Sequence, residues 1–405
     1  MKTENLFDDI GQIDGSIIAE ANTDTLKLRS AKRTWLCVAS AVAACVAIVM
    51  GIVGLHNRSS IPRGPDLPML TIDKDANAFG FEGYLAYDIS ELQHGNPWSE
   101  SDELKSLPVF QNLTSYDGAG RPIKGLSADE MMQNAREAAS KLSLTVDLIY
   151  TNPTAEDLQK EQEKERAMPG NEDYEGNATP YEAIAVCDDI TIHVEANGAV
   201  RIFFDKGVAL PDEYSFTNYD STEQQAKDAM RFLLEQYAPI VAMESPALDL
   251  LGDYTYSGQR LFSCFAYENS GGLTDRIIHY NFNRIKFSPD DHGRLEIIDR
   301  YVTDLSQKIG DYPIISVQEA RKLLLQKRYI TTVPEELPEA KYTASVELVY
   351  RTGRHDQVFM PYYRFLVELP ALQRDNGLKT FGAFYVPAVE GRYLTNMPLW
   401  DGSFN

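Results

Sequence analysis

Residues 190–204 read ITIHVEANGAVRIFF, with hydrophobic and polar residues alternating on both sides of Gly198. This alternation is typical of two antiparallel strands joined by a tight turn. A two-residue turn would place Val194 opposite Arg201 and mix the two faces of the hairpin. A three-residue loop with Gly198 in the left-handed conformation instead pairs Val194 with Val200 and keeps one apolar face continuous, so we expect that register. The same register gives the pairs Ile192–Ile202 and Ile190–Phe204.

Three helical patterns recur along the chain, and each opens with Ser followed three residues later by Glu or Gln. They are SADEMMQNAREAASKL from Ser127, STEQQAKDAMRFLLEQY from Ser221 and SVQEARKLLLQKRY from Ser316, with the pairs Ser127/Glu130, Ser221/Gln224 and Ser316/Glu319. Each pair predicts a capping box, in which the hydroxyl and the acid or amide bind free backbone amides of the first turn. Because the helix starts lie 94 and 95 residues apart, the pattern predicts a repeat.

Runs of β-branched and aromatic residues follow each predicted helix and are bounded by turn residues. They are LTVDLIYT, YEAIAVCD and ITIHVEANGAVRIFF after the first helix, DLLGDYTYS, RLFSCFAYE, IIHYNFNRIKF and GRLEIIDRYV after the second, and TASVELVYR, PYYRFLVEL and FGAFYVPAVEGRYL after the third. Each unit is therefore expected to hold one helix packed on about four antiparallel strands. Turns containing Gly198, Gly293 or Gly391 would join the last two strands. The predicted fold class is α+β, with about three repeated two-layer units.

The stretch TWLCVASAVAACVAIVMGIVGL, residues 34–55, carries no charged side chain. As a helix it would reach about 33 Å, enough to cross a bilayer, so it predicts a single transmembrane helix. A cleaved signal peptide and a buried core helix are the alternatives. Four cations precede the stretch, Lys27, Arg29, Lys32 and Arg33, which predicts a cytoplasmic N-terminus and an extracytoplasmic bulk at the cell membrane. Ala39, Ala43, Ala47 and Gly51 share one helix face, where two spans of a homodimer could meet.

These patterns together predict six consecutive segments. They are a cytoplasmic tail (1–33), the transmembrane helix (34–55), a stalk with an irregular lead-in (56–110), and three α+β units (111–215 with a polar insertion at 152–180, 216–310 and 311–405).

The charge of the chain bears on its partners. The formal net charge is −22, and nearly all of it lies beyond residue 55. Nucleic acid is therefore not expected as a partner.

Of the four cysteines, Cys187 and Cys264 lie in the predicted units, where the sequence leaves open whether they form a bridge or remain two buried thiols.

The sequence contains no motif that assigns a catalytic, cofactor-binding or metal-binding residue. DKDANAFGFEGY (73–84) resembles a calcium loop, but Ala78 and Tyr84 stand where Gly and Glu are needed. SPDDHG (288–293), which holds His292, reads as a turn. Cys187 and Cys264 would need a nearby base such as His193 or His279, and no third orienting group is evident.

In PYYRFLVEL (361–369) the alternation places Tyr362, Arg364, Leu366 and Glu368 on one face. We expect this face to be solvated and the opposite face to be core; a binding groove on the first face is the alternative.

The tail, the apolar stretch and the closing PYYRFLVEL…FGAFYVPAVEG together resemble uncharacterised single-pass membrane proteins of Gram-positive anaerobes. The units resemble PepSY-type domains and the exported accessory regulators of envelope-sensing histidine kinases, in which a helix packs on strands closed by a glycine hairpin. This resemblance implies binding or inhibition rather than catalysis.

The expected function is thus that of a membrane-anchored regulatory protein that binds a protein or peptide partner outside the cell, with no enzymatic activity and no cofactor. A cytoplasmic partner of the tail is a further expectation. An anchored hydrolase and a structural assembly subunit are the alternatives.

Overall fold

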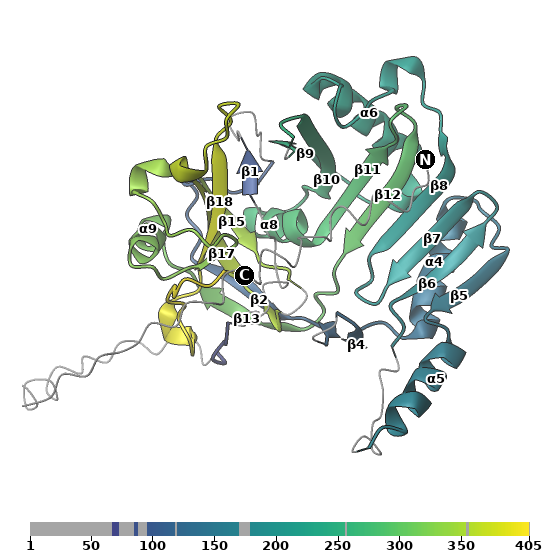
Figure 1. The fold of residues 1–405 in the computed structure, drawn as a ribbon, viewed down its shortest axis with the longest axis horizontal. Coiled ribbons are helices and arrows are strands. Elements are labelled where there is room, and N and C mark those ends of the chain that lie inside the picture. Colours follow the sequence, from purple (N-terminus) through teal and green to yellow (C-terminus); the bar gives the residue numbers. More distant parts are fainter. Residues whose placement is uncertain are drawn as a thin grey trace, which may run out of the picture. The chain divides into compact units, whose positions relative to one another are not determined.

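A computed structural model describes residues 67–72, 85–87, 95–117, 120–169, 179–255, 257–353 and 356–404. These residues form a mixed α+β structure with six α-helices and several antiparallel sheets (Figure 1). The chain divides into residues 1–66 and residues 67–405, and the description below concerns the second part.

Eight antiparallel strands form the largest sheet, in the order β5-β6-β7-β8-β12-β11-β10-β9. Their bounds are β5 Leu148–Asn152, β6 Glu182–Cys187, β7 Ile190–Glu195, β8 Val200–Val208, β9 Pro246–Tyr254, β10 Arg260–Glu268, β11 Asn283–Pro289 and β12 Leu295–Val302. The sheet is continuous because β8 pairs with β12. The strands expected in the first two units therefore join into one sheet rather than two.

Two long helices cover one face of this sheet (Figure 1). α4 (Ala128–Lys141) packs on β5, β6 and β7, and α6 (Glu223–Gln236) packs on β9 and β10; the short α7 (Ala238–Val241) follows α6. α4 begins with the predicted capping box of Ser127 and Glu130. In α6 the box is formed one residue later than predicted, by Thr222 and Gln225.

The hairpin of β7 and β8 has the predicted register. Val194 pairs with Val200, and the pairs Ile192–Ile202 and Ile190–Phe204 also form. Gly198 has a φ of +87°, the left-handed conformation that the three-residue loop requires. The apolar face of the hairpin lies under α4, so the local pattern of residues 190–204 sets which side of the sheet is covered.

A second sheet of five strands follows the order β1-β18-β17-β15, with β14 also paired to β18. The bounds are β1 Leu85–Tyr87, β14 Ile330–Thr331, β15 Thr343–Tyr350, β17 Pro361–Glu368 and β18 Thr380–Pro387. Beside it are the three-stranded sheet β13 (Lys308–Pro313), β2 (Ser106–Gln111) and β16 (Val358–Phe359), and the pair β3 (Ser115–Tyr116) and β4 (Pro122–Lys124). Helix α9 (Val317–Leu325) is capped by Ser316, whose hydroxyl accepts the backbone N–H of Glu319, and it packs on β18. This contact is one half of the predicted capping box.

One expected strand, IIHYNFNRIKF, is formed only in its second half, as β11, and the last expected strand is not formed. Residues 273–282 are the helix α8 (Leu273–Phe282), with Ile277, Tyr280 and Phe282 buried, so the prediction of a strand through IIHYNF was wrong. Ile277 and Tyr280 are three residues apart and share one helix face, which a reading by β-propensity alone overlooks. After β18 the chain forms the short helix η7 (Gly391–Tyr393) in place of a final hairpin at Gly391.

The prediction that the face of β17 with Tyr362, Arg364 and Leu366 is solvated is also wrong. Tyr362 and Leu366 are buried against residues that include Tyr385 and Tyr280, and Arg364 forms an ion pair with the buried Glu347 of β15. The opposite face of β17 is core, as predicted.

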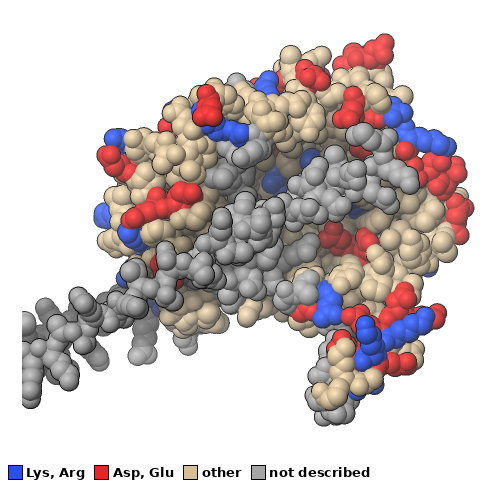
Figure 2. Space-filling model, viewed as in Figure 1, with Lys and Arg blue, Asp and Glu red and all other residues tan. Residues whose placement is uncertain are grey.

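The polar insertion forms the helix α5 (Ala155–Arg166), which has no buried residue. Figure 2 shows basic and acidic side chains interspersed over this helix, at the lower right of the view. α5 is thus a solvated excursion of the chain, as its composition predicts.

The structure corrects the prediction of a membrane-spanning fold. In the described residues, no helix is long and apolar enough to cross a bilayer, and the longest, α4 and α6, have 14 residues each. Residues 34–55, on which the transmembrane prediction falls, lie outside the described ranges. The described residues form an α+β fold, and the single-pass and cell-membrane predictions are not supported by it.

Candidate binding face on the eight-stranded sheet

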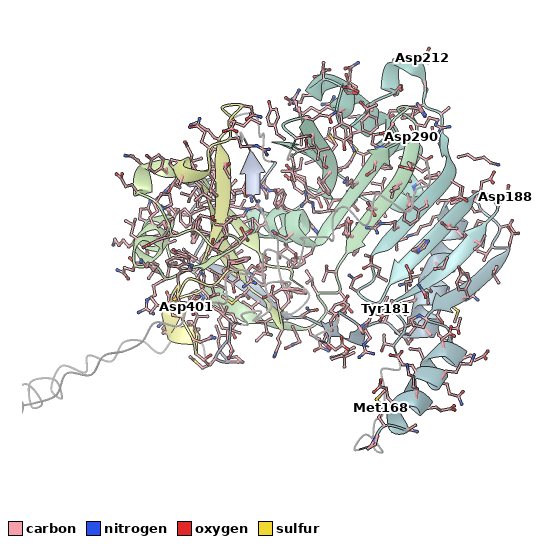
Figure 3. All side chains as sticks on the ribbon, viewed as in Figure 1. Met168, Tyr181, Asp188, Asp212, Asp290 and Asp401 are labelled. Atoms are coloured by element: carbon pink, nitrogen blue, oxygen red, sulfur yellow. The ribbon has the colours of Figure 1, made fainter. Side chains whose placement is uncertain are left out.

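The face of the eight-stranded sheet opposite α4 and α6 carries charged and aromatic side chains. One residue from each strand lies directly opposite its neighbour, and these residues form a line across the sheet that we call the charged row. Its members, in sheet order, are Tyr150, Ile184, His193, Arg201, Asp299, Lys286, Phe265 and Asp249. In Figure 3, Tyr181 and Asp188 mark the two ends of β6, and Asp290 marks the turn between β11 and β12.

The β9 end of the charged row is closed. Asp249 is fully buried; its carboxylate pairs with Arg284 Nη2 at 3.1 Å and accepts the backbone N–H of Gly95 at 2.7 Å. Helix α8 covers this end, and its Tyr280 ring lies under the Arg284 guanidinium, 5.1 Å from centroid to Cζ. A buried pair held by an additional backbone hydrogen bond fixes the neighbouring elements in place, so this end of the row is structural.

The centre of the row holds an ion pair between Arg201 and Asp299. The Arg201 side chain keeps about a third of its surface exposed, whereas Asp299 is almost buried. Burial alone would lower the pKa of Arg201, but the hydrogen bond and charge of Asp299 outweigh burial and raise it. Arg201 therefore remains charged across the physiological range.

Lys286 is adjacent to this pair, between Asp299 and Phe265 in the row. Its half-buried side chain places Nζ 5.6 Å from the centre of the Phe265 ring. No hydrogen bond or ion pair joins its ammonium group to any residue that the structure describes. Burial lowers the pKa of Lys286; Arg201 lowers it further, and Asp299 partly offsets both effects. Lys286 is the cation of the row whose charge is not neutralised by direct contact.

The row member His193 is hydrogen-bonded to a third carboxylate, that of Glu182 on β6. His193 Nδ1 lies 2.8 Å from Glu182 Oε2, and Asn152 donates to the other Glu182 oxygen at 3.1 Å. The hydrogen bond from His193 lowers the pKa of Glu182, against the opposing effect of burial. The His193 ring also meets Phe203 edge to face at 5.0 Å between centroids. Polar groups and ring edges thus alternate along a part of the sheet that remains half exposed.

The residues weighed in the sequence for nucleophilic chemistry are not brought together as a reactive group. Cys187 and Cys264 are free, buried thiols in the helix-covered core. Burial raises the pKa of Cys187, and it raises that of Cys264 to about 12. His193 lies on β7, as predicted, while His279 lies on α8.

Of the two remaining sequence candidates, one lies in a described turn and the other lies outside the described residues. Residues 290–293 form the predicted turn, in which Gly293 N–H donates to the carbonyl of Asp290 at 3.1 Å. The calcium-like stretch at 73–84 lies outside the described residues. Among those that are described, no three His, Cys, Asp or Glu side chains are grouped to hold a metal ion.

A cavity of about 350 Å³ lies beside the row, near the end of β12 and the turn between β7 and β8. Tyr301, Asn197, Gln307, Lys124 and Glu130 are among its lining residues. Glu130 already binds the backbone of Ser127 as part of the cap of α4, and the cap hydrogen bonds lower its pKa. One carboxylate of the cavity lining is therefore already engaged in the cap of α4.

The charged row was missed in the sequence because its members come from eight strands whose order is set by long-range pairing. One signal was available, since the predicted hairpin register already places His193 opposite Arg201. Two long polar side chains facing each other on the uncovered side of a hairpin indicate a polar surface, but they do not reveal which strand comes next.

No protein-family model matches the sequence, and no curated protein matches it.

Proposed function

We propose that this chain is a binding protein that holds a peptide or protein segment against the charged row, and that it regulates its partner by binding rather than by catalysis. The observation that carries the proposal is the position of Lys286. The other ionisable residues of the row have partners: His193 pairs with Glu182, Arg201 with Asp299, and Asp249 with Arg284. Among the described residues, Lys286 is the one charge of the row that forms no hydrogen bond or ion pair.

The chemistry of the partner follows from this arrangement. An ammonium group with a pKa lowered by burial gains free energy when a carboxylate comes within contact distance. The rings of Phe265 and Phe203 flank the central charges and offer apolar contact. We therefore propose an occupant that carries an Asp or Glu side chain beside an aromatic or aliphatic residue.

Binding is favoured over catalysis by the state of the reactive groups. Both thiols described are buried and have raised pKa values, which keeps them protonated and unreactive. The imidazole of His193 is hydrogen-bonded to the carboxylate of Glu182, and no hydroxyl or thiol of the described residues is hydrogen-bonded to it. The helix α4 on β6 and β7, closed by the Gly198 hairpin, supports the proposed relationship to PepSY-type domains.

The proposal is tested by selecting short random peptides, displayed on phage, against the full chain. We expect enriched sequences to contain Asp or Glu next to an aromatic residue. A synthetic peptide of the enriched sequence, labelled with a fluorophore, should bind the wild type and lose at least about tenfold in affinity on Lys286→Glu.

The matched control is Lys164→Glu on the solvated helix α5, which changes the net charge equally. This variant should bind the peptide as the wild type does. Equal loss in both variants would show that only overall charge matters. Unchanged binding to Lys286→Glu would place the peptide elsewhere on the molecule. Either result would overturn the assignment of the charged row.

A further inference from the structure

The helix-covered face of the eight-stranded sheet contains one charged residue in an otherwise apolar line. Directly opposite residues across seven strands are, in sheet order, Ala183, Val194, Val200, Arg300, Ile285, Ala266 and Leu248. Arg300 is 8% exposed. A guanidinium buried among aliphatic side chains is costly unless it is paired, so its presence needs a reason.

The contacts of Arg300 within the protein do not neutralise it. Its Nη1 donates to the backbone carbonyls of Arg284 at 3.2 Å and Tyr301 at 3.1 Å. No carboxylate of the described residues lies within ion-pair distance of it. Burial lowers the pKa of Arg300 to about 10, and Glu268, acting from further away, offsets only part of this effect.

Glu268 is not available to move toward Arg300. Its carboxylate accepts the backbone N–H groups of Glu244 at 2.6 Å, Ser270 at 2.9 Å and Ser245 at 3.2 Å, which hold the loop after α7. A guanidinium has five N–H donors, and two carbonyl contacts from Nη1 leave the Nε and Nη2 donors of Arg300 without an acceptor in the described chain.

Arg300 is one of the residues that line a cavity of about 210 Å³. Its apolar lining comes from Val200 of β8, Val302 of β12, Ala138 of α4 and Ile240 of α7. Its polar lining comes from one face of α4, where Asn134, Glu137 and Lys141 follow at steps of three and four residues. The cavity thus combines one buried guanidinium, aliphatic walls and a polar rim.

We propose that this cavity binds a carboxylate attached to a short aliphatic chain, with the two carboxylate oxygens on the free donors of Arg300. A planar guanidinium matches a carboxylate through two parallel hydrogen bonds. The aliphatic walls suit a branched hydrocarbon tail, and Glu137 at the rim disfavours a multiply charged anion such as phosphate. The ligand is a free carboxylic acid or the carboxyl end of a peptide, which share this chemistry. The site is separate from the charged row, because β12 presents Arg300 and Asp299 on opposite faces.

The test measures the thermal unfolding midpoint of the full chain with isocaproate as the probe. With a dissociation constant of about 1 mM, about 10 mM isocaproate should raise the midpoint by roughly 2 °C. Isocaproamide, which has the same tail without the charge, should give no shift. An equal shift with the amide, or an equal shift with inorganic phosphate, would overturn the proposal.

Variants then assign the effect to Arg300. Arg300→Gln should weaken isocaproate at least about tenfold by calorimetric titration, whereas Arg136→Gln on the exposed face of α4 should leave it unchanged. If Arg300→Gln fails to fold, Val302→Trp keeps the guanidinium and fills the cavity from a position that is 46% exposed, and it should abolish binding. Binding retained in Val302→Trp or in a folded Arg300→Gln would refute the site.

A second ligand series separates the two sources of the carboxylate. If the site binds the carboxyl ends of peptides, acetylated alanyl-leucine with a free carboxyl end should bind at least as tightly as isocaproate. If the site binds free acids, only isocaproate should bind. Loss of binding to both ligands would contradict the proposal.

Discussion

Lys286 and Asp299 lie directly opposite each other on β11 and β12, yet Asp299 forms its ion pair with Arg201 on the other side. Arg201, Asp299 and Lys286 therefore lie side by side on three neighbouring strands. The carboxylate of Asp299, in the middle, forms an ion pair with Arg201 only. This arrangement leaves the ammonium of Lys286 partly buried and available to an anion from outside.

The first prediction concerns the pKa of Lys286. Asp299 raises this pKa and Arg201 lowers it, so the two substitutions should act in opposite directions. We expect Arg201→Gln to raise the pKa of Lys286 and Asp299→Asn to lower it further. The measurement is an NMR titration of the chain with carbon-13-labelled methyl groups on its lysines, with Lys164 as the internal reference. Shifts of the same sign in both variants would contradict the assigned geometry.

The second prediction concerns the buried pair at the closed end of the charged row. Asp249→Ala leaves Arg284 without its carboxylate and the Gly95 amide without its acceptor. We expect a loss of about 3–5 kcal/mol in the free energy of unfolding, measured by urea denaturation. The control is Asp311→Ala, which breaks the exposed pair with Lys308 and should cost less than about 1 kcal/mol. Similar losses at both sites would show that the Asp249 pair is not a structural anchor.

The third prediction compares two glycines with similar backbone conformations. Gly293 and Gly377 have φ values of +75° and +85°, so Ala at either position pays for a left-handed backbone, about 1–2 kcal/mol. A Cβ at Gly293 would also lie 2.2 Å from Ser215 Oγ, whereas at Gly377 it would meet nothing within 4 Å. Gly293→Ala should therefore lower the thermal unfolding midpoint more than Gly377→Ala.

Combining Gly293→Ala with Ser215→Gly removes the clashing hydroxyl and should recover part of the difference. No recovery would mean that the backbone of Phe216, also close to the added Cβ at 3.3 Å, limits the turn instead.

The fourth prediction concerns the two thiols. At about pH 8, a thiol with a pKa of about 12 is almost entirely protonated, and burial also blocks reagents. We expect Cys187 and Cys264 to resist iodoacetamide in the native protein and to react in urea, with each site followed by peptide mass spectrometry. Rapid alkylation of Cys264 in the native protein would contradict its position in the core.

Local patterns predicted the elements well wherever the decisive contacts were local. The cap at Ser127 and the register across Gly198 depend on residues a few positions apart, and both were read correctly. The start of α6 was placed one residue early, because Ser221 Oγ accepts the N–H of Thr217 in the preceding loop and Thr222 caps the helix.

The pairing of strands that are distant in the chain could not be predicted from the sequence. Arg201 and Asp299 are 98 residues apart, and no local pattern indicates that β8 meets β12. Alternation in PYYRFLVEL correctly separated two faces, but it could not show that Tyr362 and Leu366 would meet other parts of the protein instead of water. The burial of Arg300 could not be predicted either, because a charged residue in a strand is expected to face solvent.

The pairing of β8 with β12 has a consequence for how the chain can be divided. The sheet order runs inward from β5 to β8 and from β12 outward to β9, so four strands on each side mirror one another about a single seam. A cut between residues 215 and 216 would expose a row of unpaired backbone amides and carbonyls on both fragments. Fragments made together should reassociate along that seam, and intact chains at high concentration could exchange halves through it to form a swapped dimer.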